Sequence, residues 1–181
     1  GCNMIVETRD NTVMRLRPRS NERVNQFFMC DHGRGNYRWL NRRDRLDTPS
    51  ILGAGGHAVV DWEVALEGAA RVLKGKKIFV LASPNLSNEA LFLLSRLVKK
   101  SGGVGAYRVE QGAEASLPGA PDLALRADRA ANATGAQLLG FTRHESPLDL
   151  LQPGDALVVA DQDLAEHDVA AVGRASVVVV I

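Results

Sequence analysis

The sequence has only two cysteines, 5% aromatic residues and no long apolar run. A helix that spans a bilayer needs about 20 consecutive apolar residues, and no stretch approaches that length. A positively charged leader followed by an apolar segment is also missing. Two cysteines without such a leader favour a reducing compartment, where thiols bind metals or react more often than they form disulfides. We therefore expect a cytoplasmic protein with no direct membrane insertion.

Basic and acidic residues are unevenly distributed, although the net charge is only +1. Residues 1–46 contain ten arginines and five acidic residues, whereas the remainder contains twelve basic and sixteen acidic residues. This change of sign predicts a domain boundary near Asp47, Thr48 and Pro49. Basic segments can bind nucleic acid, but no aromatic stacking platform or groove-entering motif accompanies the arginines. We therefore expect no nucleic-acid partner.

The first segment has the pattern of a small β-rich unit. Apolar and polar residues alternate on both sides of Asp10-Asn11, which predicts a β-hairpin. Asp31 or a neighbour is a candidate N-cap for a helix that runs to about Arg42. On such a helix the arginines at positions 34, 38, 42 and 45 would share one face. That face is either a positive rim beside a metal centre or a solvated surface.

After Pro49, short apolar strands alternate with amphipathic helices, which predicts a parallel α/β sheet. The expected strands are Lys77–Ala82, Val104–Val109, Ala156–Ala160 and Ser176–Ile181. Helices are expected after Asp61, from Ser87 or Asn88 to Gly102, from Asp122 to Thr134 and from Leu164 to Val172.

The segment Gly53-Ala54-Gly55-Gly56-His57-Ala58 matches the dinucleotide-binding pattern G-x-G-x-x-A superficially. No buried strand precedes these glycines and strand-like residues follow them, so we interpret them as a flexible turn. The four histidines show no metal-ligand spacing.

The segment from Val24 to Asn41 strongly resembles the iron–sulfur segment of the large G subunit of bacterial NADH–quinone oxidoreductase (respiratory complex I), in the molybdopterin-oxidoreductase superfamily. In that family a C-x2-C-x3-C cluster is followed by the cysteine of a C-D-x-G-R motif. Cys30-Asp31-His32-Gly33-Arg34 matches this motif, and Cys2 matches the third cysteine of the cluster. More faintly, the helix after Asp61 resembles a later element of the superfamily.

The resemblance implies that Cys2 and Cys30 are two of the four ligands of a [4Fe–4S] cluster in an intact parent. It implies that residues 1–47 are the C-terminal part of an iron–sulfur domain and residues 48–181 the N-terminal part of a molybdopterin-oxidoreductase-like α/β domain. Both ends look cut through structure, so we expect an excised piece with no catalytic residue and no stable cluster of its own.

For the parent, the resemblance implies an electron-transfer and scaffold subunit that helps pass electrons from NADH through iron–sulfur clusters toward quinone. Its partners would be the other subunits of the respiratory complex, at the periphery of the inner membrane. No cysteine follows Cys30 and no serine lies in a recognisable ligand motif, so no molybdopterin is expected. The apolar strand Ser176–Ile181 would leave an open sheet edge, and we expect self-association there.

Two other functions stay open. One is a molybdopterin-dependent oxidoreductase such as a formate dehydrogenase, which would need a cysteine or selenocysteine metal ligand elsewhere in the parent. The other is a structural interaction domain without a working cluster, which the absence of a C-x2-C pair before Cys2 would favour.

Overall fold

In the computed structural model the chain divides into two compact units, residues 1–61 and 62–181. The structure describes residues 2–109, 111–117, 120–125, 127–128 and 130–181. Within these ranges, no helix is long and apolar enough to cross a membrane. The assignment of residues 1–47 and 48–181 to parts of two domain types stays a prediction.

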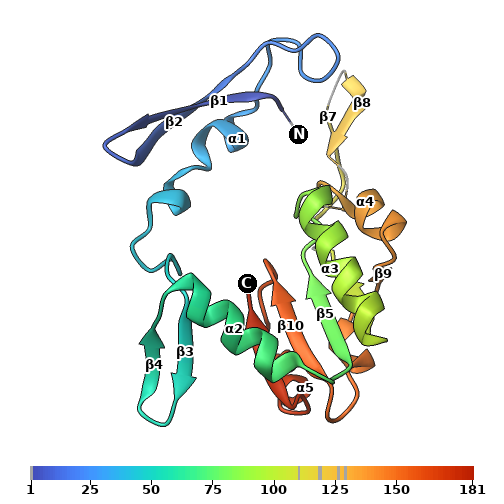
Figure 1. The fold of residues 1–181 in the computed structure, drawn as a ribbon. Helices are drawn as coiled ribbons and strands as arrows, with labels where there is room; N and C mark the ends of the chain where they lie inside the picture. Colours follow the sequence, from blue (N-terminus) through green and yellow to red (C-terminus); the bar gives the residue numbers. More distant parts are fainter. Residues whose placement is uncertain (1, 110, 118–119, 126, 129) are drawn as a thin grey trace. The chain divides into compact units, whose positions relative to one another are not determined.

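The first unit begins with an antiparallel hairpin of β1 (Met4–Arg9) and β2 (Thr12–Pro18) (Figure 1). Both turn residues have a left-handed backbone, with φ of 48° at Asp10 and 56° at Asn11. Two such residues form the tight turn whose twist matches that of the paired strands. The predicted hairpin is confirmed.

The helix predicted to run to Arg42 is shorter than expected. It is α1 (Asp31–Gly35), and a separate 3₁₀ helix, η1 (Arg38–Asn41), follows it. Asn36 lies between them with φ −86° and ψ 57°, which is not helical. The four arginines therefore do not share one helical face, and the prediction of a common face is wrong.

The glycine-rich segment is the turn of a second hairpin, formed by β3 (Ser50–Gly53) and β4 (Gly56–Val59). Gly56 has φ 104°, a conformation that residues with a Cβ rarely adopt. The interpretation of this segment as a turn is confirmed.

The second unit contains a five-stranded sheet in the order β11-β10-β5-β6-β9, and each neighbouring pair is parallel. This confirms the predicted α/β class with a parallel sheet. The strands are β5 (Ile78–Ala82), β6 (Val104–Tyr107), β9 (Thr142–Arg143), β10 (Ala156–Ala160) and β11 (Val177–Val180). Two further strands, β7 (Ala115–Leu117) and β8 (Ala120–Leu125), form a separate antiparallel pair.

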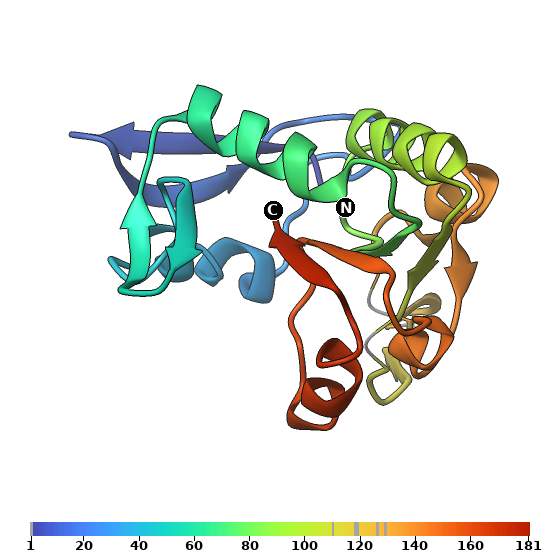
Figure 2. The ribbon, with the colours of Figure 1, turned by 60° about the horizontal axis from the view of Figure 1, so that its bottom comes forward.

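Helices cover both faces of this sheet (Figure 2). They are α2 (Trp62–Leu73), α3 (Asn88–Ser101), α4 (Ala133–Leu138), η2 (Pro147–Leu150), η3 (Glu166–Asp168) and α5 (Val169–Val172). One face of β5 and β10 packs against α3 and α4 through Leu91, Leu94 and Ala136, and the other packs against η2, Leu151 and α5. Successive side chains of a strand point to opposite faces of the sheet. In β5 and β10 all of them are apolar, as expected for strands that are buried on both faces.

The helix predicted for residues 122–134 is wrong at both ends. Residues 120–125 belong to β8, and α4 begins only at Ala133. Residues 126 and 129 of that range lie outside the described part of the chain.

Candidate metal centre

Cys30 is the N-cap residue of α1, and its side chain is exposed. Its Sγ atom accepts a hydrogen bond from the backbone N–H of Gly33, with 3.4 Å between sulfur and nitrogen. A Cβ atom at Gly33 would lie 3.3 Å from Cε of Met29 and 3.7 Å from Sγ of Cys30. A side chain at position 33 would therefore crowd Met29 rather than the sulfur, and the N–H of Gly33 points at the sulfur. Hydrogen bonds to the sulfurs are among the factors that set the potentials of iron–sulfur centres.

Cys2 is half-buried and lies directly before Asn3 and strand β1. The carbonyl of Asn3 accepts a backbone hydrogen bond from Arg19, with 3.0 Å between the atoms. The pairing of β1 with β2 is thereby extended toward Cys2. The position of Cys2 is thus set by the hairpin. The position of Cys30 is set by the turn before it and by helix α1 after it.

Asn25 connects these two cysteine-bearing segments. Its Oδ1 accepts the backbone N–H of Asn3 at 3.2 Å, and its Nδ2 donates to the carbonyl of Phe28 at 3.0 Å. Nδ2 also lies 3.3 Å from the carbonyl oxygen of Arg19 and 3.5 Å from that of Asn3. One side chain therefore bonds to the residue after Cys2 and to a residue two positions before Cys30.

A four-thiolate site would need two cysteines besides Cys2 and Cys30. Both are free thiols, and neither is fully buried. Among the described residues, no group of three or more His, Cys, Asp or Glu side chains is arranged to hold a metal ion. The donor type, the exposed sulfur and the N–H donor of Gly33 fit an iron–sulfur ligand role. That Cys2 and Cys30 bind a cluster stays a prediction.

Five of the ten arginines of the first unit form ion pairs with acidic residues among the described residues. Glu7 on β1 faces Arg15 on β2 and forms ion pairs with Arg15 and Arg17. The hydrogen bond from Arg15 is the main reason why the pKa of Glu7 lies below its ordinary value. Arg42 likewise lowers the pKa of Asp44 through a side-chain hydrogen bond.

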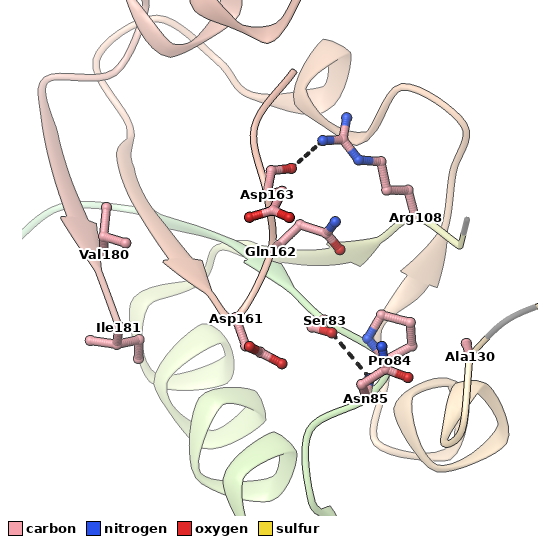
Figure 3. Close-up of a pocket in the computed structure, with 10 residues that line it drawn as sticks. All are labelled: Ser83, Pro84, Asn85, Arg108, Ala130, Asp161, Gln162, Asp163, Val180 and Ile181. Carbon is pink, nitrogen blue, oxygen red and sulfur yellow. Dashed lines mark hydrogen bonds between the residues drawn. The ribbon is translucent and has the colours of Figure 1, made fainter. Parts of the chain in front are cut away.

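A hollow of about 390 Å³ lies in the α/β unit where the sheet strands end (Figure 3). If the five strands of the sheet are numbered 1 to 5 along the chain, their order across the sheet is 5-4-1-2-3. The direction of this order reverses between β5 and β10. Crevices at such a reversal are the usual ligand sites of open α/β sheets. The lining residues are Ser83, Pro84, Asn85, Arg108, Ala130, Asp161, Gln162, Asp163, Val180 and Ile181.

This hollow is poorly suited to a phosphate-bearing cofactor. The guanidinium of Arg108 already pairs with the buried Asp168 at 2.8 Å and donates to the carbonyl of Asp163. The carboxylates of Asp161 and Asp163 add negative charge. Neither loop, residues 83–87 or 161–168, contains a glycine that would let its backbone approach a phosphate closely.

Sequence reasoning identified both cysteines through their motif but missed Asn25 and the N–H donor of Gly33. Asparagine is common in turns, so its presence at position 25 did not indicate a link between distant segments. Its partner Asn3 is 22 positions away. The structure is needed to see that bond.

Two parts of known proteins are similar to this chain. Residues 1–38 match the family described as "NADH-ubiquinone oxidoreductase NDSU1/NuoG-like, 4Fe-4S domain". The chain is 37% identical over 98 residues to the G subunit of the NADH-quinone oxidoreductase of Pseudomonas fluorescens, and 35% identical over 99 residues to that of Escherichia coli K12. Each alignment covers 54% of this chain but only 10% and 11%, respectively, of the relative.

Proposed function

Because the chain is a relative of the G subunit of bacterial NADH-quinone oxidoreductases, with a NuoG-like 4Fe-4S segment at residues 1–38, we propose that it serves in electron transfer within such a complex. Cys2 and Cys30 are two ligands of a [4Fe–4S] cluster, and two further thiolates come from outside these 181 residues, which contain no other cysteine. When bound, such a cluster accepts and donates one electron at a time.

The observation that supports this proposal is the geometry at Cys30. Its sulfur is exposed, accepts the N–H of Gly33 and lies in the segment that matches the iron–sulfur family. In this proposal Cys2 and Cys30 supply thiolates and the N–H of Gly33 donates a hydrogen bond to the sulfur of Cys30. The buried Met29 anchors the turn before α1.

The test is a Cys30→Ser variant in the complex that contains this sequence, with His32→Gln as the control on the same helix. Electron paramagnetic resonance of the reduced complex should lose one [4Fe–4S] signal in Cys30→Ser and retain all signals in His32→Gln. Iron analysis should fall accordingly. Retention of every signal in both Cys30→Ser and Cys2→Ser would overturn the cluster role and favour a structural interaction domain.

The α/β unit is proposed to be a scaffold related to molybdopterin oxidoreductases that binds no molybdopterin itself. The hollow at the strand ends supports this, since its arginine is already ion-paired and two carboxylates line it. Stoichiometric molybdenum in the purified complex would contradict it and favour a molybdenum enzyme such as a formate dehydrogenase.

The partners are proposed to be the other subunits of an NADH-quinone oxidoreductase, on the cytoplasmic side and peripheral to the inner membrane. The residues of this chain would not carry out chemistry on NADH or quinone. Co-purification of this chain with a membrane-bound NADH-oxidising complex, and its release with the other peripheral subunits, would test the assignment.

A further inference from the structure

We propose that Asn25 is a positioning residue. Before any metal binds, it holds the backbone next to Cys2 and the backbone next to Cys30 in place, so that both thiols can bind the same metal. This inference rests on the proposed role of the two cysteines as ligands of one centre. Asn25 itself does not touch the metal. It acts through the backbone next to each cysteine.

The bonds of Asn25 reach both segments at once. The acceptor Oδ1 binds the N–H of Asn3, the residue that follows Cys2, at 3.2 Å. The donor Nδ2 binds the carbonyl of Phe28, just before Met29 and Cys30, at 3.0 Å. An amide side chain carries its acceptor and its donors on separate atoms, so it can accept from one segment and donate to the other.

The backbone of Asn25 is itself fixed, so its side chain is a rigid link. The N–H groups of Asn25 and Gln26 both donate to the carbonyl of Asn21, at 3.1 and 2.7 Å. The carbonyl of Asn25 accepts from Phe28 at 2.7 Å. Gln26 has a left-handed φ of 49°, which turns the chain at this point. A turn built in this way presents the amide at a fixed distance from both cysteine segments.

The effect of this link should be measurable with a metal ion that two thiolates can bind together. Cd²⁺ alone is suitable because it is a soft cation that prefers thiolates. Two preorganised thiols should bind it more tightly than one, since the second Cd–S bond forms within one molecule. The dissociation constant of Cd²⁺ for the whole chain is measured by titration, with the thiolate-to-metal absorption band as the signal.

The decisive variants are Asn25→Ala, which removes the four contacts, and Asn25→Leu, which removes them but keeps the bulk of the side chain. Each should weaken Cd²⁺ binding about tenfold, the effect of losing one or two hydrogen bonds. Asn21→Ala is the matched control, because it keeps the backbone carbonyl that binds Asn25 and, among the described residues, removes only the Oδ1 acceptor of the Arg23 N–H. A second control is Asn41→Ala, whose two bonds to Val13 stabilise the same unit away from the cysteines.

A purely structural role predicts that Asn41→Ala weakens Cd²⁺ binding as much as Asn25→Ala does, and that result would overturn the proposal. Equal binding by Asn25→Ala, Asn25→Leu and Asn21→Ala would also overturn it. So would a wild-type affinity no higher than that of Cys2→Ser. If an Asn25 variant does not fold, hydrogen exchange of the backbone amides in the wild type tests the proposal instead. The Asn3 N–H should be protected, and exchange at the rate of an unstructured peptide contradicts the link.

Failure of the proposed function has a different outcome. If the complex shows no cluster loss in Cys30→Ser, yet the chain binds Cd²⁺ in a way that depends on Asn25, the cluster role is wrong and the positioning of the thiols stands. If the cluster signal is lost but Asn25 has no effect on Cd²⁺ binding, the cluster role stands and the positioning role is wrong.

Discussion

Arg108 and Asp168 form an ion pair within the α/β unit, with 2.8 Å between Nη1 and Oδ2. The Asp168 side chain is only 3% exposed and that of Arg108 only 17%. The same Oδ2 accepts the N–H of Ala165 at 2.7 Å, and Arg108 also donates to the carbonyl of Asp163. This pair therefore fixes the loop that follows β10 to the end of β6.

Replacement of Asp168 by Ala should destabilise the α/β unit by about 2–4 kcal/mol, because it leaves a poorly solvated guanidinium and the Ala165 N–H without their acceptor. Amide exchange of β10 under native conditions reports on this unit alone. The exposed neighbour Glu166 provides the control variant, Glu166→Ala, which should change exchange little. Equal protection in Asp168→Ala and wild type would show that the pair contributes nothing to stability.

Gly103, which directly precedes β6, has no room for a side chain. A Cβ atom there would lie 1.9 Å from the carbonyl oxygen of Ile78, a backbone atom of the central strand β5. Gly103→Ala should therefore lower the free energy of unfolding by about 3 kcal/mol or more. Gly173→Ala is the control, since its Cβ would approach nothing closer than 3.4 Å. Urea unfolding of both variants gives the comparison, and similar midpoints would contradict the steric argument.

Glu7 should make the stability of the first unit depend on pH. The hydrogen bond from Arg15 lowers the pKa of Glu7 below its ordinary value of 4.5. A lowered pKa in the folded state stabilises the fold above pH 4.5, and this contribution is lost as the pH falls through the lowered pKa. The difference in stability between wild type and Glu7→Gln should thus be largest at neutral pH.

Thermal unfolding of wild type and Glu7→Gln from neutral pH down to about pH 3 measures this difference. The two curves should converge at the acid end. Glu22→Gln, an exposed acidic residue of the same unit, is the control substitution. Curves that stay parallel over the whole range would show that the ion pair is not linked to folding.

Strand β11 should promote self-association. In the described sheet it pairs only with β10, and Val180 is 61% exposed. An unprotected apolar edge pairs readily with another chain, and lysine on an edge strand suppresses such pairing. Val180→Lys should lower the average mass seen by light scattering at high concentration, whereas Leu138→Lys, at an exposed apolar residue of α4, should not. A monomeric wild type would make this prediction wrong.

Local signals in the sequence were sufficient for several elements. Asp10-Asn11 predicted the first hairpin, because asparagine and aspartate tolerate the left-handed backbone found there. Ser87 or Asn88 was predicted to cap the start of α3, and it is the Oγ of Ser87 that accepts the N–H of Ala90, at 3.2 Å. Gly102 predicted the end of α3 and has the left-handed φ of 64° typical of a helix C-terminus.

Elements set by distant contacts were not predictable in this way. Asn132 falls inside the helix predicted for residues 122–134, but in the structure it directly precedes α4. Its Nδ2 donates to the carbonyl of Leu86 and to Oδ1 of Asn88, at 3.0 and 2.9 Å. These bonds reach across to the start of α3, which no local pattern reveals. The link through Asn25 was missed for the same reason, whereas the cysteines it connects were found by their motif.

The order of the sheet strands has a consequence for the synthesis of this protein on the ribosome. The central strand β5 is made first, and its neighbour β10 begins only at Ala156. At about 5–20 residues per second, roughly 4–15 s pass between the emergence of Ala82 and that of Ala156. During that time the fully apolar strand β5 has one unpaired edge. The nascent chain should therefore be a substrate for chaperones that bind extended apolar segments, and it should be released from them once β10 has paired.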